Sequence, residues 1–181
     1  NIMKKKIIIG VSGGIACYKT ADLVSTLAQY NFDVNVCMTP SSEKFITALT
    51  FNALTGNETY TQNTLLDSQN TYYPHLYPAT SADIFILIPA TANIIGKIAN
   101  GLADDPVSST SLSLNKECKK FFCPAMNNEM WDQKIVQNNC SKLNDLGWIQ
   151  IGPDNGNLAC GNIGKGRLSE IEEILKIILS L

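Results

Sequence analysis

Short runs of apolar residues recur along this chain, and each gives way to small or polar residues. Residues 7–11, 84–88 and 119–123 contain unbroken apolar stretches, which are typical of strands buried on both faces of a parallel sheet. The pattern is more open over residues 32–38 and shorter over residues 148–151. These five segments are the expected strands.

Helical patterns alternate with these strands. Apolar side chains at Ile15, Leu23 and Leu27 favour a helix over residues 15–30, and a further helix is expected to begin near Glu43. The region that follows, 51–73, is polar and is expected to be irregular. Later helices are expected at 94–100, 107–114, 133–146 and 171–181. Alternation of strand and helix predicts a doubly wound α/β sheet, in one domain that covers residues 1–181.

Small and polar residues follow four of the strands, at residues 12–14, 39–42, 89–93 and in the loop after Pro124. The carboxyl ends of parallel strands meet at one edge of a sheet, where ligands bind. A glycine turn before a helix offers backbone N–H groups to a phosphate or a ring. The second strand ends in hydroxyl residues where a nicotinamide-binding fold would carry an acid. A plain helix cap explains any one serine there, whereas the cluster favours a phosphate.

Composition narrows the function classes. The net charge of −2 is spread along the chain with no basic stripe, which argues against a nucleic-acid partner. No apolar run reaches the roughly 18 residues of a membrane span, and residues 1–6 show no signal peptide. The six cysteines have no metal-binding spacing, so no metal site and a reducing cytoplasm are expected.

Three side chains are candidates for chemistry. Asn127 follows an apolar strand and can donate and accept hydrogen bonds, although asparagine is also a common turn former. His75 is the sole histidine; it is either structural or a general acid/base near neutral pH. Cys160 lies in a glycine-rich segment, which is either an ordinary loop or a mobile flap that exposes the thiol as an acid or nucleophile.

The motifs around these residues resemble those of the flavin-containing cysteine decarboxylases. Pro124-Ala125-Met126-Asn127 with Met130 is similar to the family signature, and the segments 12–15, 89–93 and 159–166 match its phosphopantothenoylcysteine branch. The resemblance implies a Rossmann-like, flavodoxin-like three-layer flavoprotein and a homo-oligomer, either a trimer or a dodecamer of trimers. It also implies a small-molecule substrate of coenzyme A biosynthesis, phosphopantothenoylcysteine, which is converted to phosphopantetheine. A phosphopantothenate–cysteine ligase, fused or separate, is the implied partner.

The resemblance also implies roles for individual residues. His75 is the implied base, Asn127 holds the substrate carboxylate, and Cys160 returns a proton after a redox-assisted decarboxylation. Further implied substrate contacts are Met130, Gly161, Gly164 and Gly166. The implied FMN contacts are Gly13, Gly14, Ile15, Thr39, Ser41, Ser42, Phe45, Ala90, Thr91, Ala92, Asn93 and Ala125.

Two positions depart from the family pattern. A charged substrate contact expected near Thr80 is missing, and Asp105 stands where the family usually has asparagine. Both departures concern substrate binding. The alternatives are a peptidyl-cysteine decarboxylase of the lantibiotic type, a flavin prenyltransferase and a non-catalytic flavoprotein that regulates a phosphatase. The cysteine flap argues against the first, the proline-alanine-methionine-asparagine motif against the second, and the intact set of His75, Asn127 and Cys160 against the third.

Overall fold

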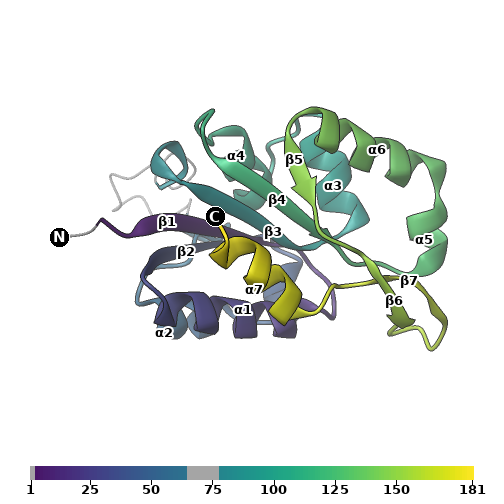
Figure 1. Ribbon diagram of the computed structural model, residues 1–181, viewed down its shortest axis with the longest axis horizontal. Helices are drawn as coiled ribbons and strands as arrows, with labels where there is room; N and C mark the ends of the chain where they lie inside the picture. The colour runs from purple at the N-terminus through teal and green to yellow at the C-terminus, as the bar shows by residue number, and fades with distance from the viewer. Residues whose placement is uncertain (1–2, 65–77) are drawn as a thin grey trace.

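The computed structural model describes residues 3–64 and 78–181, and a five-stranded parallel sheet forms its centre (Figure 1). The order of the strands is β2-β1-β3-β4-β5. All four neighbouring pairs in this sheet run parallel, which confirms the predicted doubly wound sheet. The bounds of the strands are β1 Lys5–Val11, β2 Phe32–Met38, β3 Ile84–Ala90, β4 Lys119–Pro124 and β5 Trp148–Gln150.

Helices cover both faces of the sheet, and two buried clusters fill the layers between (Figure 1). The first cluster joins the sheet to α1 (Cys17–Gln29), α2 (Ala48–Thr55) and α7 (Ile171–Leu179). The second joins it to α3 (Ala92–Ala99), α4 (Pro106–Leu112), α5 (Asn128–Asp132) and α6 (Lys134–Asp145).

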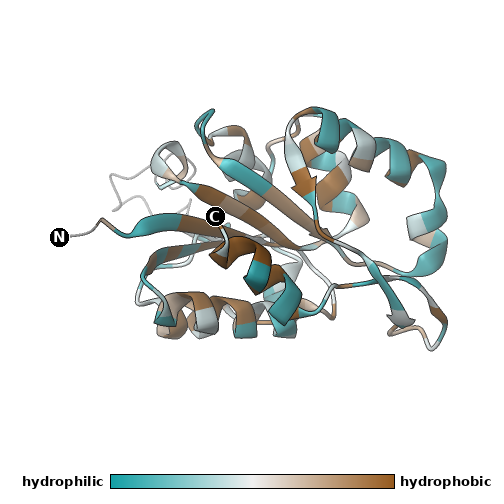
Figure 2. Cartoon of the chain, in the orientation of Figure 1, coloured by the Kyte–Doolittle hydropathy of each residue, from teal (hydrophilic) through white to brown (hydrophobic). Residues whose placement is uncertain are grey.

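The pleat of the strands explains their unbroken apolar pattern. Ile7 and Ile9 of β1 belong to the first cluster, while Ile8 between them belongs to the second. Side chains that alternate across a sheet with helices on both faces must all be apolar. Figure 2 shows the result: the central strands are hydrophobic, and the hydrophilic residues gather on the outer surfaces of the helices.

The segment after β2 differs from the prediction. Residues 42–44 form a single 3-10 turn, η1 (Ser42–Lys44), and the helix α2 starts later and extends into the stretch expected to be irregular. The reason is burial: Phe51 is fully buried in the first cluster and α2 ends at Gly56, whose φ is 74°. Neither Ser41 nor Ser42 caps a helix through its side chain: the Ser42 hydroxyl donates to the Thr39 carbonyl at 2.7 Å, and Ser41 Oγ lies 3.1 Å from Thr39 Oγ1.

The glycine-rich segment forms an antiparallel hairpin of β6 (Asp154–Asn157) and β7 (Ile163–Arg167), which the sequence did not predict. Its turn is closed by the N–H of Leu158, which donates to the Asn162 carbonyl at 2.8 Å. Its base is bonded to the loop after β4, because the Met126 N–H donates to the Gly166 carbonyl at 2.9 Å. The hairpin is therefore attached beside the carboxyl edge of the sheet, where Figure 1 shows it on the right.

Candidate functional site

A cavity of about 870 Å³ lies at the carboxyl edge of the sheet. Its wall combines the turns after β1, β2 and β3, the loop after β4 and the β6–β7 hairpin, so the predicted convergence of strand ends is present. The predicted site residues in the wall are Gly13, Gly14, Ile15, Ser41, Thr91, Ala92, Asn93, Ala125, Asn127, Met130, Cys160 and Gly166. The volume falls near the top of the range of about 300–1,000 Å³ that ligand pockets occupy.

A buried hydroxyl ties two of these turns together. Ser12 Oγ donates to the Pro89 carbonyl at 2.5 Å and accepts from the Thr91 N–H at 3.1 Å. Ser12 is buried, so this link from the end of β1 to the end of β3 is shielded from water. Sequence reasoning named no role for Ser12, although its place between a strand and the glycine turn is the signal that could have indicated one.

The glycine turn approaches the loop after β2 closely. A Cβ at Gly13 would lie 2.7 Å from Ser41 Cβ, so no side chain fits there without displacing Ser41. At Gly14 the atom nearest to an added Cβ is Thr91 Cγ2 at 3.8 Å, an ordinary contact, so this part of the turn is less crowded. The backbone N–H groups of Gly13, Gly14 and Ile15 have no acceptor within residues 3–64 and 78–181. The turn therefore presents free donors to an anion or a ring.

Only part of the hydroxyl cluster after β2 reaches the cavity. Ser41 Oγ lies in the wall, 3.1 Å from Thr39 Oγ1. Thr39 and Ser42 are buried behind it, and the Ser42 N–H donates to Thr39 Oγ1 at 3.2 Å. Phe45 is 52 % exposed but lies outside the wall, and Ala90 is fully buried in β3. Thr39 and Ser42 thus lie beneath Ser41, and their hydrogen bonds fix the turn that carries it.

The Asn127 side chain is oriented by the helix that it caps. Its Oδ1 accepts from the Met130 N–H at 2.8 Å at the start of α5, whose Trp131 is buried in the second cluster. The Asn127 Nδ2 group has no partner in the described part of the chain. Because its oxygen is engaged, the amide offers its two N–H donors to the cavity, which suits a carboxylate.

Cys160 differs from the other cysteines. It is exposed at the tip of the hairpin and lines the cavity, whereas the other five are buried. Burial raises the pKa of Cys37 to about 12, and raises the pKa of Cys118 and of Cys140 to about 11, so these thiols stay protonated at neutral pH. Accessibility thus separates Cys160 from the structural thiols, as the sequence predicted.

The hairpin glycines have different surroundings. Gly166 has a φ of 148° and lies against the Met126 carbonyl, on which a Cβ would fall. A Cβ at Gly164 would lie 2.9 Å from Asn128 Cβ, so this position also allows a close approach. Gly161 lies in the turn with a φ of 87° and no neighbour within 4 Å. Of the three, Gly166 alone belongs to the cavity wall among the described residues.

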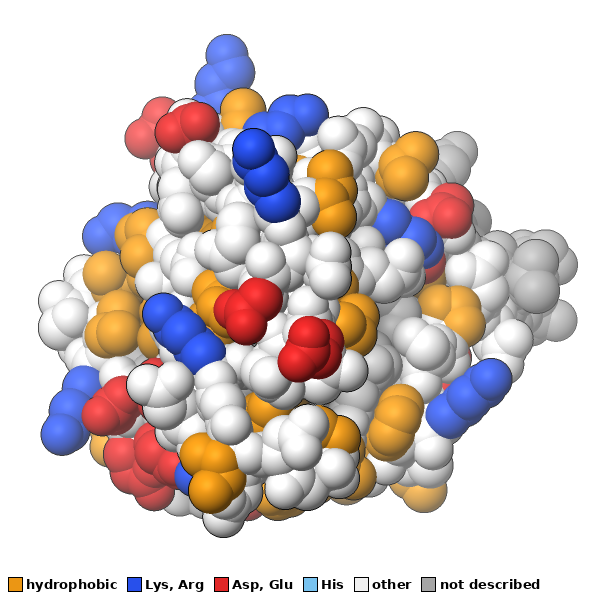
Figure 3. All heavy atoms as spheres, turned by 90° about the vertical axis from the view of Figure 1, so that its right-hand side faces the viewer, with side chains coloured by type: hydrophobic (Ala, Val, Ile, Leu, Met, Phe, Trp, Pro, Cys, Tyr) orange, Lys and Arg blue, Asp and Glu red, His pale blue; other side chains and the backbone are white. Residues whose placement is uncertain are grey.

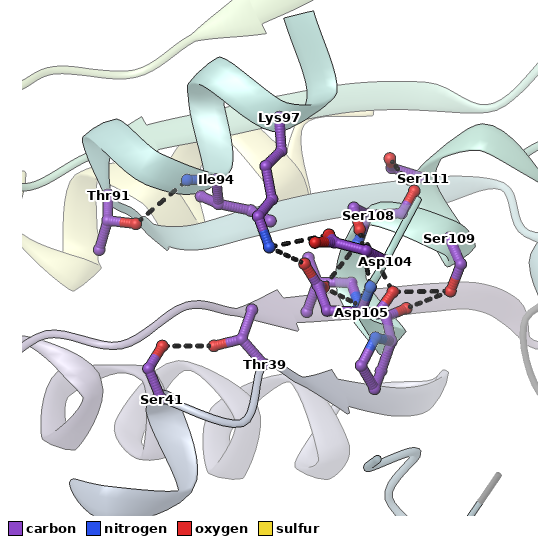
Figure 4. Close-up of polar contacts among 12 residues, drawn as sticks. Thr39, Ser41, Thr91, Ile94, Lys97, Asp104, Asp105, Ser108, Ser109 and Ser111 are labelled. Carbon is purple, nitrogen blue, oxygen red and sulfur yellow. Dashed lines mark hydrogen bonds and ion pairs between the residues drawn. The ribbon is translucent and has the colours of Figure 1, made fainter. Parts of the chain in front are cut away.

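The two departures from the family pattern lie outside this wall. Asp105 is buried and caps α4, where its Oδ1 accepts from the N–H groups of Val107 and Ser108 at 2.8 and 2.9 Å. Lys97 of α3 reaches Asp105 at 3.0 Å and Asp104 at 2.8 Å (Figure 4). Hydrogen bonding to Asp104 raises the pKa of Lys97 and lowers the pKa of Asp104. Asp105 therefore joins α3 to α4 through Lys97. Thr80, the second departure, lies in the 3-10 turn η2 (Ala79–Ser81) before β3.

His75 lies outside the residues that the structure describes, so its role stays a prediction. Within residues 3–64 and 78–181, no group of His, Cys, Asp and Glu side chains is suited to a metal ion. None of the helices described is both long and apolar enough to cross a membrane.

The model of the flavoprotein family matches residues 1–181. The chain belongs to this family. It is 40 % identical over 176 residues to a probable phosphopantothenoylcysteine decarboxylase of Streptococcus mutans, covering 97 % of this chain and 98 % of that protein. It is 43 % identical over 173 residues to the coenzyme A biosynthesis bifunctional protein CoaBC of Bacillus subtilis, covering 96 % of this chain. The matched region is 42 % of the bifunctional protein's length.

Several solved structures share the fold of this chain. A cysteine-to-serine mutant of PPC decarboxylase complexed with pantothenoylaminoethenethiol has a TM-score of 0.89 at 27 % identity, over 98 % of this chain and 97 % of that one. The FMN binding protein AtHal3 has a TM-score of 0.85 at 27 % identity, over 98 % of this chain and 96 % of that one. The agreement over nearly the whole chain confirms the expected three-layer flavoprotein fold.

Proposed function

We propose that this chain is an FMN-dependent phosphopantothenoylcysteine decarboxylase, which forms phosphopantetheine in coenzyme A biosynthesis. The main support is that one cavity joins free backbone donors, an oriented amide and an exposed thiol. The relative at 40 % identity carries this activity in its name, and the relative at 43 % identity is named as a bifunctional protein of coenzyme A biosynthesis.

The donor set of the cavity fits FMN. The free N–H groups of the glycine turn and the Ser41 hydroxyl suit the phosphate group of FMN. Thr91, which caps α3, lies beside Gly14 in the same wall. Ala92, Asn93 and Ala125 in the wall offer small side chains against which a flat ring can lie. FMN, when bound, supplies the reversible oxidation that gives the departing carboxylate an electron sink.

The protein's own groups then position the substrate and move protons. Asn127 Nδ2 donates to the substrate carboxylate, while the hairpin covers the substrate and excludes water. Cys160 delivers the final proton from the hairpin, since a thiol with a reference pKa near 8.5 is a far stronger acid than a hydroxyl. His75 acts as the general base.

The decisive experiment combines a spectrum with a product assay. The purified protein, supplied with FMN, is expected to show an oxidised flavin band and to release carbon dioxide and phosphopantetheine from phosphopantothenoylcysteine. An unsaturated ene-thiol as the wild-type product would favour a peptidyl-cysteine type of oxidative decarboxylase instead. Flavin binding without any carbon dioxide release would favour a non-catalytic flavoprotein. Protein that binds no flavin would contradict all three.

The assembly belongs to the same proposal. We infer that residues 1–181 form a single FMN-binding domain that works in the cytoplasm as a homo-oligomer, either a trimer or a dodecamer of trimers. The length of the bifunctional relatives supports a ligase as partner, fused or separate, because this chain matches 42 % of one such protein.

A further inference from the structure

Charge is distributed unevenly around the cavity. Among the wall residues in the described part of the chain, Lys19 and Arg167 carry charge, and no carboxylate is present. Lys19 is partly buried on the first turn of α1, and its side chain makes no hydrogen bond or ion pair with residues 3–64 or 78–181. Neither cation was predicted as a site residue. A cavity with two cations and no carboxylate favours anionic ligands.

Arg167 is held in place by its neighbours. Its side chain crosses the backbone of Gly156, where a Cβ would lie 2.8 Å from Arg167 Cδ and 3.2 Å from Nη1. Its Nη2 donates to Glu170 Oε1 at 2.7 Å, and Glu170 lies outside the cavity wall. A guanidinium carries five N–H donors, so one ion pair leaves others available to a ligand. The arginine is thus a fixed cation at the base of the hairpin.

The cavity wall draws on segments from both faces of the sheet. Ala16 and Leu168, in the segments that carry Lys19 and Arg167, pack into the first buried cluster. Met126 and Trp131, which flank Asn127, pack into the second. The cavity therefore extends across the sheet edge, where the Met126 N–H, which donates to the Gly166 carbonyl, joins the loop of Asn127 to the strand of Arg167. Figure 3 views this end of the molecule, where basic and acidic side chains are scattered over a largely uncharged surface.

We propose that Lys19 and Arg167 bind the phosphate group of the substrate, while Asn127 binds its carboxylate. This assignment rests on the proposed function, whose substrate carries a carboxylate and a phosphate at its two ends. Arginine binds phosphate through paired N–H donors, and lysine adds a point charge. The glycine turn and Ser41 offer a separate donor set for the phosphate of FMN.

The test compares phosphopantetheine with pantetheine, which differ only in the phosphate group, by calorimetry on the FMN-loaded protein. The variants are Lys19→Gln, Arg167→Gln and the double variant. Each single variant is expected to bind phosphopantetheine about 10- to 100-fold more weakly, the effect of losing a charged hydrogen bond. Binding of pantetheine and of FMN, the latter followed by flavin fluorescence, should change little.

Lys165→Gln is the matched control, because Lys165 is an exposed cation on the same strand outside the wall. It should retain full preference for the phosphorylated ligand. Arg167→Lys keeps the charge but loses the paired donors, so an intermediate affinity is expected, and it serves as the second variant if Arg167→Gln folds poorly.

Three results would overturn the assignment. Loss of FMN affinity in the variants would place the cations at the cofactor phosphate. Equal weakening of both ligands would mean that the cations do not recognise phosphate, and a double variant that still prefers phosphopantetheine would place that group elsewhere. Failure of the proposed function is seen separately, as wild-type protein that releases no carbon dioxide from phosphopantothenoylcysteine.

Discussion

The turns at the sheet edge and the β6–β7 hairpin line the same cavity but are held in different ways. The turns continue directly from buried parallel strands and are tied together by Ser12, whose two hydrogen bonds are buried. The hairpin is a separate two-stranded sheet, joined to the loop after β4 by the Met126–Gly166 bond. Its tip, with Cys160, is exposed. This contrast indicates a rigid wall for the cofactor and a less constrained wall over the substrate.

The comparison predicts that damage to the turns removes the cofactor, whereas damage to the hairpin leaves the cofactor and alters the fate of the substrate. The largest effect is expected for Gly13→Val. A side chain at this position would collide with Ser41, because even a Cβ would lie 2.7 Å from Ser41 Cβ. FMN binding, measured by flavin absorbance after gel filtration, should be lost together with all decarboxylation.

Gly96→Ala is the control for Gly13→Val. Gly96 lies within α3, and its Cβ would meet Asn139 Nδ2 at 3.5 Å, an ordinary contact. Alanine in a helix interior is favoured by about 1 kcal/mol over glycine, so this variant should melt slightly higher and bind FMN normally. Normal FMN binding by Gly13→Val would show that the turn can move, and would remove the distinction between the two walls.

The next largest effect is expected for Asn127→Asp. Aspartate also caps helices well, so α5 and the melting temperature should change little. The two N–H donors are replaced by a negative charge facing the substrate carboxylate. Loss of a hydrogen bond to a charged group costs about 1.5–3 kcal/mol, and repulsion adds to it, so kcat/KM should fall by about 100-fold or more. Unchanged kinetics with FMN still bound would mean that Asn127 does not contact the substrate.

Gly166→Ala tests how firmly the hairpin is attached. Its φ of 148° and its contact with the Met126 carbonyl leave no room for a Cβ. Strain of about 1–3 kcal/mol should displace the base of the hairpin and lower kcat/KM by about 10-fold, while FMN stays bound. Loss of FMN from this variant would indicate that the hairpin belongs to the cofactor wall. Gly161→Ala, in the open turn, should affect activity less, although its positive φ also disfavours alanine.

The sequence predicted the sheet edge better than the hairpin, for a physical reason. Strands such as 7–11 and 84–88 are buried on both faces, so an unbroken apolar run is enough to predict each of them. The residues that follow a parallel strand must then lie at the carboxyl edge. Glycines in β7 carry no such pattern, because strand formation there depends on close approach to Met126 and Asn128.

The same reasoning explains the other differences. The start of α2 depends on burial of Phe51, which is a tertiary effect. Lys19 and Arg167 were missed because a single cation has no motif, and only the folded chain brings α1 next to the end of β7. The sequence indicated the hydroxyl cluster after β2 but not which member faces the cavity. That orientation depends on the Thr39–Ser41 and Thr39–Ser42 hydrogen bonds.

The smallest effect on the early chemistry, and the sharpest test of the hairpin, is expected for Cys160→Ser. Cys160 is exposed on the hairpin, outside the turns that we propose bind FMN, so FMN affinity and the first carbon dioxide release should stay within a few-fold of wild type. The final protonation should fail, because a serine hydroxyl is a far weaker acid than a thiol with a reference pKa near 8.5. Under anaerobic single turnover, the flavin band should stay bleached, and mass analysis should find the unsaturated ene-thiol, lighter by one hydrogen molecule than phosphopantetheine.

Cys140→Ser is the control, since burial raises the pKa of Cys140 to about 11 and the residue lies outside the cavity wall. Its product should be the saturated thiol, as in the wild type. Release of the saturated thiol by Cys160→Ser at the wild-type rate would mean that the proton comes from another group, and the hairpin would then act only as a cover.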